Sequence, residues 1–213
     1  DLRGHGESSK PVSDYTIDLY TEDLKIFLDK LEIKDKIILA GHSMGGMIAQ
    51  NFYFKYGNGV EGLILVSTTS KVNDNFSMKL NTSFAIFLMK VAYKTAYRMI
   101  LGRAFSKKVS KDEKNFYINE GLRTVPKYVA LSSFIDFVKN FDTREKLKDI
   151  KVPTLIIVGE HDRMLPPRMS LYMRDNIPES ELKIIPESGH EVMIESPDEV
   201  NKAIDSFLIS FRE

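Results

Sequence analysis

The sequence contains no cysteine among its 213 residues. This absence excludes disulfides, thiolate metal sites and a cysteine nucleophile. It fits a reducing compartment, and we expect a cytoplasmic location. The chain also lacks net charge, because 30 Lys and Arg residues balance 30 Asp and Glu residues. Overall charge therefore gives no argument for a nucleic-acid partner, and we expect none.

Long apolar runs are also absent, and no secretory segment opens the chain. The hydrophobic fraction of 43% and the charged fraction of 28% are ordinary for a globular protein. A chain of this length can bury a substantial core within one domain. Disordered, collagen-like and membrane-spanning classes therefore fit poorly.

Helices and strands alternate along the two ends of the chain. Apolar residues at helical spacing predict helices over residues 17–31, 44–56, 168–176 and 197–211. Short apolar runs predict strands over residues 36–40, 62–67, 154–159 and 182–185, and we expect the first two to be buried on both faces. This order predicts an α/β fold with a mostly parallel sheet flanked by helices. Residues 1–70 and 150–213 would form that core. Residues 71–149, which show long helical patterns, would be a helical insertion.

A candidate nucleophile lies between the first predicted strand and the helix that follows it. The sequence there is Gly41-His42-Ser43-Met44-Gly45, followed by Gly46. A Gly-x-Ser-x-Gly turn between a strand and a helix exposes its serine at the sheet edge, on strained backbone. We expect positions 41 and 45 to require a small residue such as glycine, because a larger side chain would collide with the turn. We expect Gly46 to let the following helix approach closely. The N–H of Met44 would bind an oxyanion. The alternative is a glycine-rich turn with an incidental serine.

A nucleophilic serine needs a base and an orienting carboxylate, in the order Ser, acid, His on such a sheet. The chain has four histidines, and His190 follows the fourth predicted strand. Asp162 follows the third and is the best candidate for the acid. Glu160 remains a rival carboxylate, and His161 remains a rival base. Asp162 could also be an ordinary turn residue and His190 an ordinary loop residue.

These motifs together resemble the α/β-hydrolase superfamily, in its cap-bearing esterase, lactonase and carbon–carbon hydrolase branch. The matching segments are residues 1–8, 41–46, 159–162, 189–191 and 195–200. The resemblance covers almost the whole chain and implies that residues 71–149 form a cap over the substrate. Relatives with an Asp nucleophile are disfavoured by Ser43. The substrate is not specified by these motifs.

One departure from the family concerns the start of the sequence. In the family, a segment like residues 1–6 follows the fourth strand of an eight-stranded sheet. The resemblance therefore implies an N-terminally truncated chain that lacks the first strands. It also implies that the second oxyanion donor is missing from the chain and that the strand before Ser43 has an open edge, which favours pairing or aggregation.

The expected chemistry is hydrolysis of a small-molecule ester, thioester or lactone through an acyl-enzyme. Neither a metal nor an organic cofactor is implied. The alternatives are an acyltransferase or carbon–carbon hydrolase, a non-catalytic small-molecule receptor, and an inactive fragment. Residues 71–114 carry ten basic and three acidic residues, a net charge of +7. This charge could attract an anionic substrate or a membrane surface, although we favour a solvated basic face. The oligomeric state is not predicted.

Overall fold

The computed structural model describes residues 1–209 and 211, and it contains a four-stranded parallel sheet in the order β1-β2-β3-β4. The strands are β1 (Ile37–His42), β2 (Val60–Val66), β3 (Thr154–Gly159) and β4 (Ser180–Ile185). All three neighbouring pairs are parallel. The predicted α/β fold and its parallel sheet are therefore confirmed.

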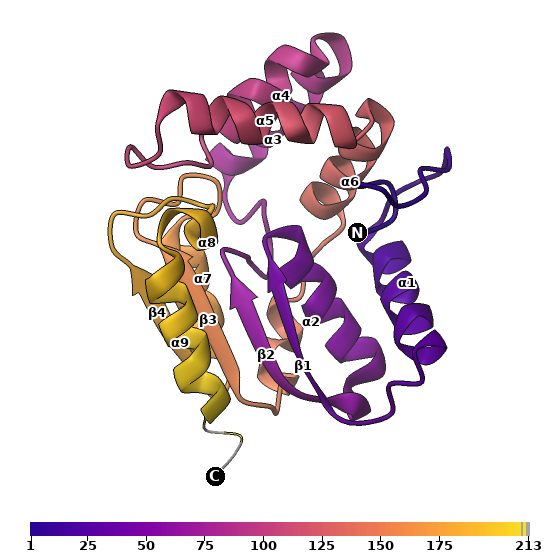
Figure 1. Cartoon of the computed structure of the whole chain (residues 1–213), viewed down its shortest axis with the longest axis vertical. Coiled ribbons are helices and arrows are strands. Elements are labelled where there is room, and N and C mark those ends of the chain that lie inside the picture. The colour runs from indigo at the N-terminus through magenta and orange to yellow at the C-terminus, as the bar shows by residue number, and fades with distance from the viewer. Residues whose placement is uncertain (210, 212–213) are drawn as a thin grey trace.

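Helices cover both faces of this sheet (Figure 1). The helices outside the insertion are α1 (Ile17–Lys30), α2 (Met44–Tyr56), α7 (Pro167–Asn176), α8 (Val192–Glu195) and α9 (Pro197–Ile209), with a 3-10 turn η1 (Gly57–Gly59). Leu63, Leu65 and Ile156 pack in a cluster with residues of α2 and α7, whereas Ile64 and Ile157 pack with residues of α9. Alternation along β2 and β3 thus buries both faces of the central strands.

Burial of β1 differs from the prediction. The strand before Ser43 was expected to be buried on both faces, yet its residues are half-buried and Ala40 is exposed. In the described part of the chain, β1 pairs only with β2 and forms an edge of the sheet. The prediction for β2 holds, since β2 pairs on both sides and is almost wholly buried.

Between β2 and β3 the chain forms a helical insertion. Its elements are α3 (Phe76–Val91), α4 (Tyr93–Gly102), α5 (Lys111–Thr124), α6 (Lys127–Lys139) and a 3-10 segment η2 (Arg144–Asp149). Figure 1 shows α3, α4 and α5 as a layer beyond the carboxyl ends of β1 and β2. Local signals set the helix starts: Asn75 caps α3, and Ser110 forms a capping box with Glu113 at α5. No described helix has the length and apolar character needed to cross a bilayer.

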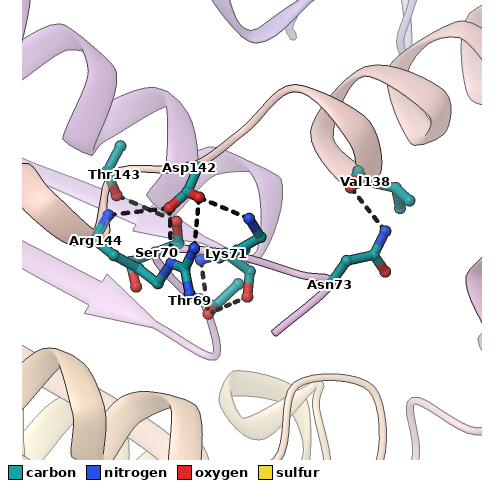
Figure 2. Close-up of polar contacts among 8 residues, drawn as sticks. All are labelled: Thr69, Ser70, Lys71, Asn73, Val138, Asp142, Thr143 and Arg144. Atoms are coloured by element: carbon teal, nitrogen blue, oxygen red, sulfur yellow. Dashed lines mark hydrogen bonds and ion pairs between the residues drawn. The ribbon is translucent and has the colours of Figure 1, made fainter. Parts of the chain in front are cut away.

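The two segments that join the insertion to the sheet lie against each other (Figure 2). Lys71 and Asp142 form an isolated antiparallel bridge, and the N–H of Thr143 donates to the carbonyl of Ser70 over 2.9 Å. The Asp142 carboxylate also accepts from Lys71 Nζ at 2.7 Å and from the Arg144 guanidinium. These contacts tie the entry and the exit of the insertion together at one point.

A buried glutamine of α2 completes this junction. Gln50 is fully buried, and its Nε2 donates to the carbonyls of Gly46 and Thr69 at 3.2 and 3.1 Å. Its Oε1 accepts from the hydroxyl of Thr143 at 2.8 Å. Every polar group of this buried side chain is therefore used, as burial requires. Gln50 links the helix that follows Ser43 to both segments that join the insertion to the sheet.

Candidate active site

Ser43 lies in a strained turn between β1 and α2. Its backbone angles are φ 51° and ψ −117°, a conformation that residues with a side chain rarely adopt. Hydrogen bonds to its backbone hold it there. The Ser43 N–H donates to the carbonyl of Val66 at 2.9 Å, and its own carbonyl accepts from Thr68 Oγ1 at 2.7 Å and from the N–H of Gly46 at 3.0 Å. The strain predicted for this serine is present, and β2 helps to maintain it.

The glycines around Ser43 have different roles. A Cβ atom on Gly41 would lie 2.3 Å from the carbonyl carbon and oxygen of Gly45, and one on Gly46 would lie 2.6 Å from the Thr68 side chain. Both positions therefore need glycine, as predicted. The prediction for Gly45 was wrong, because a Cβ there would meet no atom within 4 Å. It is the backbone of Gly45, and not its missing side chain, that crowds the turn.

Ser43, His190 and Asp162 come together at the carboxyl edge of the sheet. His190 Nε2 lies 2.9 Å from Ser43 Oγ, and His190 Nδ1 lies 2.8 Å from Asp162 Oδ2. Ser43 lies at the start of α2, His190 after β4 and Asp162 after β3. The three meet because the carboxyl ends of parallel strands lie at one edge of the sheet. His190 and Asp162 are only 2% and 3% exposed, so water scarcely reaches their hydrogen bond. This geometry matches a nucleophile, a base and an orienting acid.

The rival residues after β3 point to other partners. Glu160 Oε2 accepts from the backbone N–H of Glu187 at 2.9 Å, and His161 is exposed. Asp162 also makes the contacts of an ordinary turn residue, since its Oδ1 accepts from the N–H groups of Met164 and Leu165. Its second oxygen remains for His190. The turn contacts of Asp162 and its hydrogen bond to His190 thus use different oxygens.

The surroundings of His190 are strongly acidic. Burial disfavours the imidazolium, but the hydrogen bond to Asp162 and the charges of Asp162, Glu191 and Glu195 outweigh this effect and raise the pKa of His190. His42 behaves in the opposite way, because burial and the neighbouring His190 lower its pKa. His190 is therefore the more basic of the two rings, and its protonated form is the better stabilised.

Sequence reasoning missed the contacts to the His190 backbone. His42 Nε2 donates to the His190 carbonyl at 3.0 Å, and the His190 N–H donates to the carbonyl of Ala104 at 2.6 Å. Ala104 belongs to the insertion, which carries no motif that could have revealed this contact. All four polar groups of His190 thus have partners. His42, His190 and Glu191 also offer potential metal ligands within 4.8 Å, but both ring nitrogens of His190 are already hydrogen-bonded.

Residues 1–197 match the family described as serine aminopeptidase, S33. The AB hydrolase superfamily protein YisY of Bacillus subtilis is 32% identical over 214 residues, which cover 97% of this chain and 79% of YisY. The chain belongs to the α/β-hydrolase superfamily. A proline iminopeptidase of Saccharolobus solfataricus is 30% identical to this hydrolase, over 96% of the chain and 72% of the peptidase.

A solved structure agrees with this assignment. The structure of Est816, described as an N-acyl homoserine lactone degrading enzyme, matches this hydrolase with a TM-score of 0.86 and 28% identity. The match covers 97% of this chain and 80% of Est816. The family and these relatives are hydrolytic enzymes, so the prediction of an enzyme on this fold is confirmed.

Proposed function

We propose that this protein is a serine hydrolase that cleaves a small-molecule carboxylic ester, thioester or lactone. The observation that carries the proposal is the pair of hydrogen bonds at His190, 2.9 Å from Ser43 Oγ and 2.8 Å from Asp162. A base between a hydroxyl and a buried carboxylate activates that hydroxyl for attack on a carbonyl. The lactone-degrading activity of Est816 supports this choice of substrate class.

The proposed reaction passes through an acyl-enzyme. His190 Nε2 takes the proton of Ser43 as Oγ attacks the carbonyl carbon, and Asp162 stabilises the imidazolium. The N–H of Met44, in the first turn of α2, has no helical carbonyl to bind and is the proposed oxyanion donor. The imidazolium then protonates the departing alcohol or thiol. Water, deprotonated by His190, then attacks the acyl group, and the imidazolium returns a proton to Ser43 Oγ as the carboxylic acid is released.

We further propose that residues 71–149 act as a cap that covers the substrate. The supporting observation is the position of α3, α4 and α5 beyond the carboxyl ends of β1 and β2, the edge where Ser43 lies (Figure 1). A cover of this kind excludes water and shapes the space for the acyl and alcohol groups.

A labelling experiment with a fluorophosphonate probe tests the nucleophile. We expect the wild-type chain to be labelled on Ser43, whereas Ser43→Ala and His190→Ala should not react. Ser206→Ala is the matched control, since Ser206 is an exposed serine of α9 whose hydroxyl donates to the Lys202 carbonyl. A folded wild-type chain that resists the probe would instead support a non-catalytic receptor or an inactive chain.

A panel of substrates tests the bond that is cleaved. Activated esters, thioesters, lactones and aminoacyl anilides should be compared with wild-type and Ser43→Ala protein. We expect turnover of at least one oxygen or sulfur ester that Ser43→Ala loses. Turnover confined to the anilides would replace the proposal with a peptidase activity like that of the archaeal relative.

A further inference from the structure

A loop of the helical insertion lies directly against the loop that carries His190. Residues 103–110 connect α4 to α5, and Ala104, Phe105 and Ser106 are buried, with exposed fractions of 0%, 7% and 7%. A Cβ on Gly189 would lie 2.5 Å from the Ala104 carbonyl oxygen and 2.7 Å from the Ser106 nitrogen. Glycine at position 189 therefore permits this close approach of two backbones.

One carboxylate connects the two loops. Glu195, the last residue of α8, accepts from the N–H of Gly189 at 3.0 Å and from the N–H of Ser106 at 3.2 Å. Buried N–H groups need acceptors, and a charged acceptor binds them more strongly than a neutral one. In this contact one carboxylate serves a backbone donor from each loop.

The same contact reaches His190. The His190 N–H follows that of Gly189 and donates to the Ala104 carbonyl at 2.6 Å. Lys114 of α5 strengthens the insertion side, because its Nζ donates to the Ser106 carbonyl at 2.7 Å. Segment 104–106 thus binds the backbone of the base through Ala104, and Glu195 holds that segment in register.

We propose that Glu195 is a positioning residue whose carboxylate ties the insertion to the backbone of His190, so that docking of the insertion places the base. This inference rests on the proposed function for its effect on turnover. It differs from the roles of Asp162 and Ser43, since Glu195 acts on the backbone of His190 and not on its ring. A displacement of segment 104–106 would therefore move the base.

The first test replaces the carboxylate with an amide. Glu195→Gln keeps the size of the side chain but places an NH2 donor opposite a backbone N–H, where the carboxylate has an acceptor. We expect kcat on the best ester of the panel to fall about 10- to 100-fold with little change in KM, because small misplacement of a catalytic group has effects of this size. Glu199→Gln is the matched control, an exposed glutamate in the first turn of α9. A folded Glu195→Gln protein with wild-type kcat would overturn the proposal.

A second variant approaches the contact from the other side. Gly189→Ala leaves Glu195 intact but pushes its new Cβ against the Ala104 carbonyl. We expect the same loss of kcat, measured per labelled Ser43 so that any unfolded fraction is left out. Loss of stability in both variants with unchanged turnover per labelled site would show a structural role alone and contradict the proposal.

A third measurement does not depend on turnover. NMR titration should follow the ring of His190, which faces Asp162, Glu191, Glu195 and His42, together with amide exchange at Ser106 and Gly189. In Glu195→Gln we expect faster exchange at both amides and a lower pKa of His190, because a negative charge is removed. Unchanged exchange would overturn the proposal. If the wild type neither reacts with the probe nor hydrolyses the panel, the proposed function fails, while this titration still decides the role of Glu195.

Discussion

His42 Nε2 donates to the backbone carbonyl of His190 across 3.0 Å, so the residue before Ser43 contacts the backbone of His190. The two rings lie 4.9 Å apart between centroids. Because the lowered pKa of His42 favours its neutral form, the ring can donate this hydrogen bond without carrying a charge next to His190. The turn at Ser43 and the loop that carries His190 are thus joined at two points, the second being the hydrogen bond between His190 Nε2 and Ser43 Oγ.

Replacing His42 should weaken the fold around the base. His42→Phe retains the ring but removes the donor, which leaves the His190 carbonyl without this partner. We expect the free energy of unfolding to fall by about 1–3 kcal/mol, the usual cost of an unsatisfied buried group. Urea unfolding measures this change, and His161→Phe, at an exposed histidine, is the control. Equal unfolding free energies for the two variants would refute this role of His42.

The dependence of activity on pH follows from the raised pKa of His190. In the proposed mechanism only the neutral ring accepts a proton from Ser43, so we expect activity above this pKa and its loss below it. Burial lowers the pKa of His190, but the hydrogen bond and charge of Asp162, together with the charges of Glu191 and Glu195, outweigh burial and raise the pKa above the ordinary value of 6.5. We therefore expect the acidic limb of kcat/KM against pH to have its midpoint above 6.5.

Removal of the Asp162 charge provides the control for this pH dependence. Asp162→Asn should reduce kcat by about 10⁴-fold, because the amide favours the wrong ring tautomer. Its residual activity should show an acidic limb at lower pH than that of the wild type. A limb below 6.5 in the wild type, or no shift in the variant, would contradict the electrostatic account of His190.

The sequence supported the fold through local patterns that burial imposes. The apolar runs at residues 154–159 and 62–67 marked β3 and β2, because central parallel strands are covered on both faces. The same pattern misled at β1, where the run is apolar but the strand lies at the edge of the sheet in the described residues. Hydrophobicity reports what a strand can bury, and its pairing partners decide what it does bury.

The residues of the candidate site could be predicted from the sequence for a related reason. Ser43, Asp162 and His190 each follow a predicted strand, and parallel strands bring their carboxyl ends to one edge, so position along the chain indicated position in space. Ala104 and Glu195 follow no such rule. Their contacts with the His190 loop depend on how the insertion folds back, and no periodicity in residues 71–149 encodes that path.

Gly41 and Gly45, in the turn around Ser43, should differ in how replacement by alanine changes the stability of the protein. Gly41→Ala would drive Cβ into the Gly45 carbonyl, and we expect a loss of about 3 kcal/mol in unfolding free energy. Gly45→Ala meets open space and should leave stability unchanged or raise it by up to about 1 kcal/mol, since Ala favours a helix over Gly. Chemical denaturation of both variants tests the contrast, and similar losses at the two positions would show that the turn is crowded on both sides.

The junction shown in Figure 2 should depend on one buried hydroxyl. Thr143 Oγ1 donates to Gln50 Oε1, and both residues are buried. Thr143→Val preserves the shape of the side chain but leaves Gln50 Oε1 without its hydrogen-bond donor. We expect the free energy of unfolding to fall by about 1–3 kcal/mol. Thr143→Ser keeps the hydroxyl and should recover most of this stability, although it loses a methyl group. Urea unfolding separates the two effects: if Thr143→Ser destabilises the protein while Thr143→Val does not, packing of the methyl group and not the hydrogen bond to Gln50 holds the insertion at this point.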